Sequence, residues 1–191
     1  MSDVAAPAPA STSPSPVMSP PTPSPSSKSD PALISARGIG PYILGGSFAE
    51  ALELLGVAEE RSLPAEGFED RCPWFASATG LDSLMTYVIA DVVQESGVSA
   101  ATDVIHSVSV QDGGAAGMLL PLTDAGVGLR SSEEDVRAVY PDAATEDALN
   151  ADSALRVTEG RGAIVFEFRD GVAYFITVLP ASEPLPAEYC G

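Results

Sequence analysis

The chain has 191 residues, of which 27 are acidic and nine are basic, and its net charge is -18 at pH 7. This charge repels phosphate backbones and anionic lipid surfaces, which excludes charge-driven binding to nucleic acid or to a membrane surface. No apolar run reaches the roughly 18 residues of a membrane span, so we expect no transmembrane helix. Ordinary solubility and attraction to a basic partner are the two interpretations of the acidity.

Residues 1–37 are predicted to be a disordered Pro/Ser-rich tether. They hold nine of the 17 prolines and lack apolar periodicity, so they cannot bury enough surface to offset the entropy of ordering. The segment after Met1 reads like the start of a mature bacterial lipoprotein in which Met1 replaces the lipidated cysteine. A cytosolic chain with a flexible tail is the alternative. We expect an exported protein, extracellular or anchored at the cell surface.

Two pairs of segments align without gaps, which predicts a duplicated unit. Residues 43–56 match 128–141, and residues 76–91 match 155–170. We therefore expect repeat 1 at residues 38–116 and repeat 2 at residues 117–191.

A short helix is predicted near the start of each repeat. In each, a serine can accept a hydrogen bond at the N-cap while a carboxylate three residues on suits the helix dipole. The two pairs are Ser47 with Glu50 and Ser132 with Asp135. Gly56 and Pro141 are expected to end the helices.

Three strands are predicted after each helix, and the Asp170-Gly171 pair predicts a type I′ hairpin turn. The fold class is therefore α+β: two tandem repeats, each a helix plus a three-stranded antiparallel meander, packed as one body behind a disordered N-terminal tail. The expected strands cover residues 73–79, 84–91 and 103–111 in repeat 1 and residues 154–158, 163–169 and 172–179 in repeat 2.

The two-residue turn also predicts which side chains share a sheet face. Phe166 is expected opposite Phe175 on the core face, which leaves the other face as a candidate docking surface. The candidate partner-binding residues are His106, Glu167, Arg169, Tyr174, Ile176, Glu95 and Val98.

Residues 92–102 are an insertion in repeat 1, at the point where repeat 2 turns in two residues. They predict either a longer strand pair or a projecting recognition loop that carries Glu95 and Val98. His106 is the only histidine and is expected to be half-exposed on a strand. No second histidine or nearby thiol is available to complete a catalytic triad or a zinc site with it.

No residue cluster predicts catalysis. There is no Gly-rich phosphate loop with a lysine, because the only lysine, Lys28, lies in the tether. Carboxylates are abundant enough that some pair will lie at a glycosidase-like separation by chance, so an acid-based hydrolase is a minor alternative. We expect no enzyme activity, no cofactor and no metal site.

Cys72 and Cys190 are the only cysteines. Cys190 follows two prolines near the end of the chain and has little to pack against unless it is tied down. We predict a disulfide between them, which would contribute roughly 4–5 kcal/mol by closing a loop of about 118 residues. Two unrelated thiols are the alternative.

The paired pattern resembles a group of secreted or lipid-anchored proteins, common in actinobacteria, of the β-lactamase-inhibitor-protein-like (SmpA/OmlA-like) tandem-repeat architecture. The matching residues are Gly38-Ile39-Gly40, Gly45-Gly46-Ser47, Gly126-Val127-Gly128-Leu129, Tyr140-Pro141 and Glu188-Tyr189-Cys190. The resemblance implies a sheet face presented to a protein partner outside the cell. The chain departs from the inhibitors in lacking a disulfide within each repeat and in having Arg130 where the pattern often has Gly.

The sequence thus favours a non-enzymatic, exported protein-binding module, namely a cell-envelope lipoprotein. Its partner is expected to be a protein, and a basic protein would complement the acidic charge of the chain. Nucleic acid is excluded, and membrane contact is expected only through an N-terminal lipid anchor. The alternative is an inhibitor of a secreted hydrolase, a β-lactamase or a protease, with the 92–102 insertion as a plug.

Overall fold

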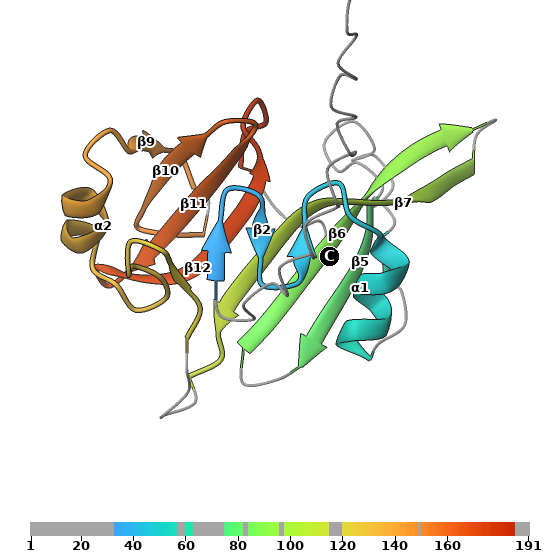
Figure 1. Ribbon diagram of the computed structural model, residues 1–191, viewed down its shortest axis with the longest axis horizontal. Helices are drawn as coiled ribbons and strands as arrows, with labels where there is room; N and C mark the ends of the chain where they lie inside the picture. The colour runs from blue at the N-terminus through green and yellow to red at the C-terminus, as the bar shows by residue number, and fades with distance from the viewer. Residues whose placement is uncertain are drawn as a thin grey trace, which may run out of the picture.

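The computed structural model describes residues 33–56, 60–62, 75–81, 84–95, 98–114, 120–148 and 150–185. In this part the chain is mostly β, with a four-stranded sheet, an eight-stranded sheet and two short helices. The small sheet lies against the middle of the large one, and the helices lie toward its opposite ends (Figure 1).

The small sheet begins inside the segment predicted to be a tether. Its strands are β1 (Leu33–Ser35), β2 (Gly38–Ile39), β3 (Tyr42–Ile43) and β8 (Leu122–Thr123), in the order β3-β2-β1-β8. β1 pairs with β2 through Ser35 and Gly38, so the boundary predicted at residue 38 falls within a paired hairpin. Residues 1–32, and the second predicted boundary at residues 116 and 117, lie outside the described residues.

Both predicted helix starts are confirmed. Helix α1 (Phe48–Leu55) has Ser47 as its N-cap, and helix α2 (Glu133–Val139) has a capping box of Ser132 and Asp135. Asp103, from a distant strand, adds a second acceptor at α1, because its carboxylate accepts from the Ala49 amide at 2.7 Å. The described part of the chain has two helices, and neither is long and apolar enough to span a membrane.

The large sheet is antiparallel throughout. In spatial order its strands are β4 (Glu60–Ser62), β5 (Phe75–Leu81), β6 (Leu84–Glu95), β7 (Val98–Asp112), β12 (Val172–Pro180), β11 (Gly162–Arg169), β10 (Ser153–Glu159) and β9 (Ala144–Glu146).

The predicted fold class, two helix-plus-three-stranded modules, is wrong. β7 and β12 pair with each other, so the strands of both halves form one continuous sheet. Two separate meanders would each leave an inner edge of unpaired backbone groups, and pairing these edges satisfies the groups. The short strands β4 and β9 extend the sheet at its two outer edges, and the helices contribute only eight and seven residues.

A β-bulge corrects the predicted register of the last hairpin. Asp170 and Gly171 have φ values of 52° and 76°, as a type I′ turn requires, and Phe168 lies opposite Ala173 as expected. The pairing then shifts between Glu167 and Phe168, which places Phe175 opposite Glu167. Because one residue of shift reverses the faces, every β12 side chain beyond the bulge lies opposite to its predicted side.

Arg130 adopts the left-handed backbone conformation that glycine favours, with φ at 66°. Its amide donates to the carbonyl oxygen of Ala173 at 2.7 Å, and its guanidinium pairs with Asp112 at 2.6 Å. These contacts hold a non-glycine residue where the sequence pattern often has Gly.

The hydrophobic core lies on one face of the large sheet, called here the inner face. Ile34 of the small sheet, Phe48 of α1 and Val136 of α2 pack there with sheet residues such as Val108 and Phe166, and all five are at most 3% exposed. The opposite face, called the outer face, has a much smaller apolar cluster and carries the polar groups described next.

Candidate binding face

The outer face carries a row of side chains that the strand pairing aligns. Glu146, Ala154, Glu167 and Phe175 lie opposite one another on β9, β10, β11 and β12, and Gln111 continues the row on β7. The small side chain of Ala154 leaves two carboxyl groups, those of Glu146 and Glu167, as neighbours along the row.

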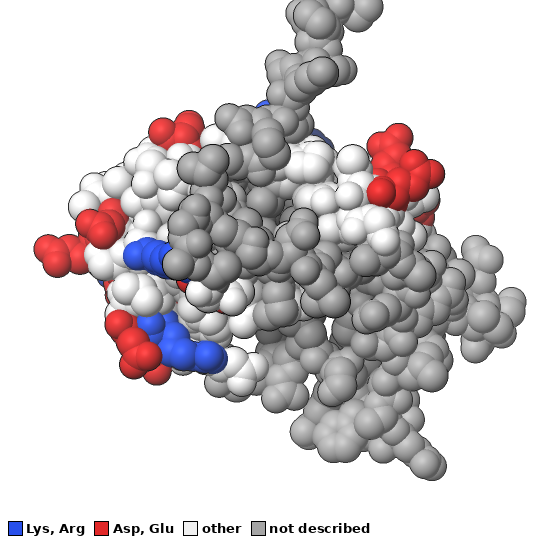
Figure 2. All heavy atoms as spheres, turned by 90° about the horizontal axis from the view of Figure 1, so that it is seen from below, with Lys and Arg blue, Asp and Glu red and all other residues white. Residues whose placement is uncertain are grey.

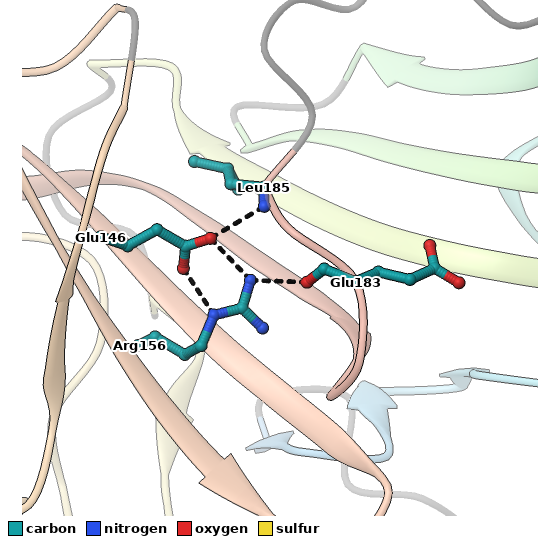
Figure 3. A network of polar contacts seen from close by, with 4 residues as sticks. All are labelled: Glu146, Arg156, Glu183 and Leu185. Atoms are coloured by element: carbon teal, nitrogen blue, oxygen red, sulfur yellow. Dashed lines mark hydrogen bonds and ion pairs between the residues drawn. The ribbon is translucent and has the colours of Figure 1, made fainter.

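An ion pair at the end of this row anchors the segment after β12. The guanidinium of Arg156 donates to both carboxylate oxygens of Glu146, at 2.6 and 2.7 Å, and to the backbone carbonyl oxygen of Glu183 at 2.8 Å. The amide of Leu185 donates to Glu146 at 2.8 Å (Figure 3). We call residues 181–185 the strap, because these contacts fasten them over the outer face.

His106 holds the strap from the other side. Its Nε2 lies 2.6 Å from the Glu183 carboxylate, while Leu185 packs on the small outer cluster of Ala154, Val165 and Leu179. The strap thus reaches from β7 across to β9. His106, predicted to lie on the docking face, instead takes part in fastening the strap.

Burial raises the pKa of both carboxyl groups, but among the described residues only Glu146 has hydrogen-bond donors that bring its pKa back down. Glu167 is only 7% exposed, and burial, with a smaller effect of the nearby Glu146 charge, raises its pKa from 4.5 to about 7, although Arg169 opposes the rise. Burial also raises the pKa of Glu146, but the hydrogen bonds from Arg156 and the Leu185 amide outweigh it and bring the pKa below its usual value. Glu146 therefore holds its charge at neutral pH, and Glu167 titrates near it.

The exposed Arg169 and the half-buried Tyr174 form a pair next to Glu167. The guanidinium carbon of Arg169 lies 4.2 Å from the centre of the Tyr174 ring. Both side chains donate to the carbonyl oxygen of Asn150, Arg169 at 2.8 Å and Tyr174 at 2.9 Å. Burial, followed by the Glu167 charge, raises the pKa of Tyr174, so its hydroxyl stays protonated and remains a donor.

The aromatic surface continues from this pair across the sheet. The ring centres of Tyr174 and Phe175 are 6.2 Å apart, and those of Phe175 and Tyr87 are 5.9 Å apart. The Tyr87 hydroxyl donates to Gln111 at 3.2 Å. We call Arg169, Tyr174, Phe175 and Tyr87 the aromatic stripe. Its three rings are half-buried and so present part of their surface to solvent.

The structure brings together three of the predicted partner-binding residues, Glu167, Arg169 and Tyr174. Ile176 is wrongly assigned, because the bulge places it opposite Phe166 on the inner face, where it is fully buried. Sequence reasoning also missed the role of Phe175, since an unshifted register puts it in the core. No signal in the sequence announces the bulge, because Glu167 also lies on the outer face in an unshifted register.

Glu95 and Val98 lie at the far end of the β6–β7 hairpin, away from the aromatic stripe. They pair with each other at the tip of the β6–β7 hairpin, whose register continues from Val92 opposite Ala101. The insertion therefore forms a longer strand pair, and in Figure 1 it projects beyond the body of the sheet. The side chains of Glu95 and Val98 are outside the description, as are Cys72 and Cys190, so the disulfide stays a prediction.

Acidic groups dominate the charge of the described surface. Figure 2 views the molecule from below. In this view acidic side chains project from both ends of the described surface, and the few basic side chains lie mostly beside them. Within the described ranges, no group of three His, Cys, Asp or Glu side chains could hold a metal ion.

No protein-family model matches the chain, and no curated protein matches it. Among solved structures, a cysteine-rich secretory protein from Staphylococcus aureus subsp. aureus is similar, with a TM-score of 0.42 and 10% identity over 84% of this chain. The match covers 55% of that protein, so this chain spans about half of its length. A likeness this weak supports no inference, and the resemblance to the β-lactamase-inhibitor-like group stays a prediction.

Proposed function

We propose that this chain is a non-enzymatic protein-binding module and that the aromatic stripe is its contact surface. The observation that carries the proposal is the stacking of Arg169 on Tyr174, with both side chains held by the Asn150 carbonyl oxygen. Tyrosine and arginine are the residue types that most often dominate the energy of protein interfaces.

Order in the free protein supports the same proposal. Fixing a long side chain at an interface costs about 0.5–1.5 kcal/mol. Arg169 already has two partners and Tyr174 is held by Arg169, Asn150 and Phe175, so part of this cost is met before binding. A partner that covers the rings would also gain from burying their exposed apolar surface.

The charge around the stripe favours a basic protein as the partner. Asp152 accepts from the amide of Asp170 at 2.8 Å, so both acids lie at the end of the hairpin that carries Arg169. Together with the net charge of -18, they would attract and orient a basic surface.

The proposal can be tested by affinity capture from the envelope and extracellular fractions of the native organism. Tyr174→Ala and Arg169→Ala should each reduce retention of the partner about tenfold or more, as expected for residues at the centre of an interface. Arg137→Ala is the matched control, because Arg137 is an exposed arginine on α2. The proposal would be refuted if the unmodified chain and the three variants retained the same amount of partner, or if the unmodified chain retained none.

We also propose that the protein is exported and held at the cell surface by a lipid, with the residues before β1, 1–32, as the tether. The Pro/Ser-rich composition of this segment supports a spacer role. Cell fractionation and mass spectrometry of the native N-terminus test this, and recovery of an unlipidated protein in the cytosol would exclude it.

A second candidate function is inhibition of a secreted hydrolase, a β-lactamase or a protease. The projecting β6–β7 hairpin favours it, because paired strands can hold a tip in an enzyme cleft at low entropic cost. Nanomolar inhibition of one enzyme in a panel, lost on deleting residues 92–102 and kept in Tyr174→Ala, would favour this function over the aromatic stripe.

A further inference from the structure

A cavity of about 570 Å³ opens where the β1–β2 turn and the end of β3 meet the β10–β11 turn. This volume falls within the range of small-molecule sites, about 300–1,000 Å³. Ala36, Ile43, Leu44 and Pro180 line it with apolar surface. It lies apart from the aromatic stripe and has no part in the proposed function.

The walls of the cavity are fixed by close backbone contacts. A Cβ atom on Gly162 would lie 1.7 Å from the carbonyl oxygen of Ala36, so only glycine allows the two turns to approach this closely. The Leu44 amide donates to the Arg37 carbonyl oxygen at 2.8 Å, and the Ala181 amide donates to the Arg161 carbonyl oxygen at 2.9 Å. The cavity is thus built into the fold before any ligand arrives.

Two exposed arginines, Arg37 and Arg161, line the cavity. Neither guanidinium has an ion-pair partner among the described residues, whereas Arg130, Arg137 and Arg156 each pair with a carboxylate. Leaving two guanidiniums without a partner in so acidic a chain favours an anion from outside.

The lining also limits the size and charge of the ligand. Glu159 lies in the same lining, so two guanidiniums and one carboxylate leave a single positive charge. The carbonyl oxygens of Arg37, Ile43 and Arg161 already accept backbone hydrogen bonds, which leaves few partners for the main chain of a peptide. The site therefore suits a monoanion with an apolar body rather than a phosphate dianion or an extended peptide.

We propose that this cavity binds a small monocarboxylate with an apolar body, such as a medium-chain alkyl carboxylate. The alkyl chain would pack on Ile43, Leu44 and Pro180, and the carboxylate would accept hydrogen bonds from Arg37 and Arg161. Glu159 would weaken the binding by repelling the carboxylate.

The test is titration of the isotope-labelled full chain with octanoate, octanol and octylammonium, followed by NMR. Octanoate should shift the amides of Arg37, Leu44 and Gly160 with a Kd below about 1 mM, and octanol should bind at least tenfold more weakly. The double variant Arg37→Gln/Arg161→Gln should weaken octanoate binding about tenfold or more, and Glu159→Gln should tighten it about two- to threefold.

Arg137→Gln, which changes an exposed arginine on α2, should bind octanoate as the unmodified chain does. Equal binding of octanoate and octanol, no binding at several millimolar, or unchanged affinity in the double variant would overturn the proposal. A peptide with a free C-terminal leucine that binds tenfold tighter than octanoate would also overturn it, by assigning the site to a chain terminus. If the double variant fails to fold, the comparison of octanoate with octanol on the unmodified chain decides.

Discussion

Replacing Glu167 by Gln should stabilise the protein at pH 8 and leave its stability nearly unchanged at pH 4.5. Glu167 is 7% exposed, and burial raises its pKa from 4.5 to about 7. The folded state therefore favours the protonated side chain. The protonated Glu167 side chain contributes its full stabilisation below about pH 4.5. This contribution is lost as the pH rises through 7, because the folded protein then holds a buried negative charge.

The size of the effect follows from the two pKa values. A rise from 4.5 to about 7 corresponds to about 3 kcal/mol of unfolding free energy between low and high pH. Residual solvent contact reduces this figure, so we expect a gain of about 2 kcal/mol for Glu167→Gln at pH 8. Glutamine keeps the shape of the protonated acid, which isolates the charge from any change in packing.

Urea denaturation of both chains at half-unit pH steps from 4.5 to 8 measures this difference. Taking the difference between the chains cancels the contribution of every other group that titrates in this window. Glu53→Gln, at an exposed position on α1, should follow the unmodified chain. If the unfolding free energies of Glu167→Gln and the unmodified chain change in parallel with pH, or if the variant is less stable at pH 8, ionisation of the buried carboxyl does not destabilise the fold.

Three further changes test contacts that hold the fold. Glu146→Ala should cost about 3 kcal/mol of unfolding free energy, since it leaves the largely buried guanidinium of Arg156 without its carboxylate. Gly162→Ala should cost at least about 2 kcal/mol, because the new methyl group would collide with the carbonyl oxygen of Ala36. Ile176→Ala should cost about 3 kcal/mol, since the side chain is fully buried on the inner face. Denaturant unfolding measures all three.

Each change has a matched control. Arg137→Ala removes an exposed ion pair and should cost at most about 1 kcal/mol. Gly114→Ala meets no atom within 4 Å and should cost only the strain of a left-handed alanine, about 1 kcal/mol. Val139→Ala, at an exposed position on α2, should cost much less than Ile176→Ala. A cost for Ile176→Ala no greater than that for Val139→Ala would support the unshifted register and contradict the bulge.

Local features of the fold could be predicted because adjacent residues determine them. The caps at Ser47 and Ser132 and the Asp170-Gly171 turn each depend on a few neighbours in the sequence. The pairing of β7 with β12 could not be predicted, because it joins residues more than 60 positions apart and follows from satisfying two sheet edges at once. Asp103 at the start of α1 is another contact of this kind.

The candidate site was predicted in part for the same reason. Arg169 and Tyr174 flank a turn that the sequence shows, so their proximity could be inferred. Phe175 was placed on the wrong face, because a single bulge between Glu167 and Phe168 reverses the alternation beyond it. The strap was missed altogether, since its anchors on β7, β9 and β10 meet only in the folded sheet.

Photo-cross-linking from the stripe tests the proposed binding surface most directly. A photoreactive phenylalanine analogue would be placed at position 174, or at position 139 on exposed α2 as the control, and irradiated in the native extracellular and envelope fractions. We predict one protein adduct from position 174 that is absent from position 139. The same adducts from both positions, or none from position 174, would contradict the assignment of the aromatic stripe as the contact surface.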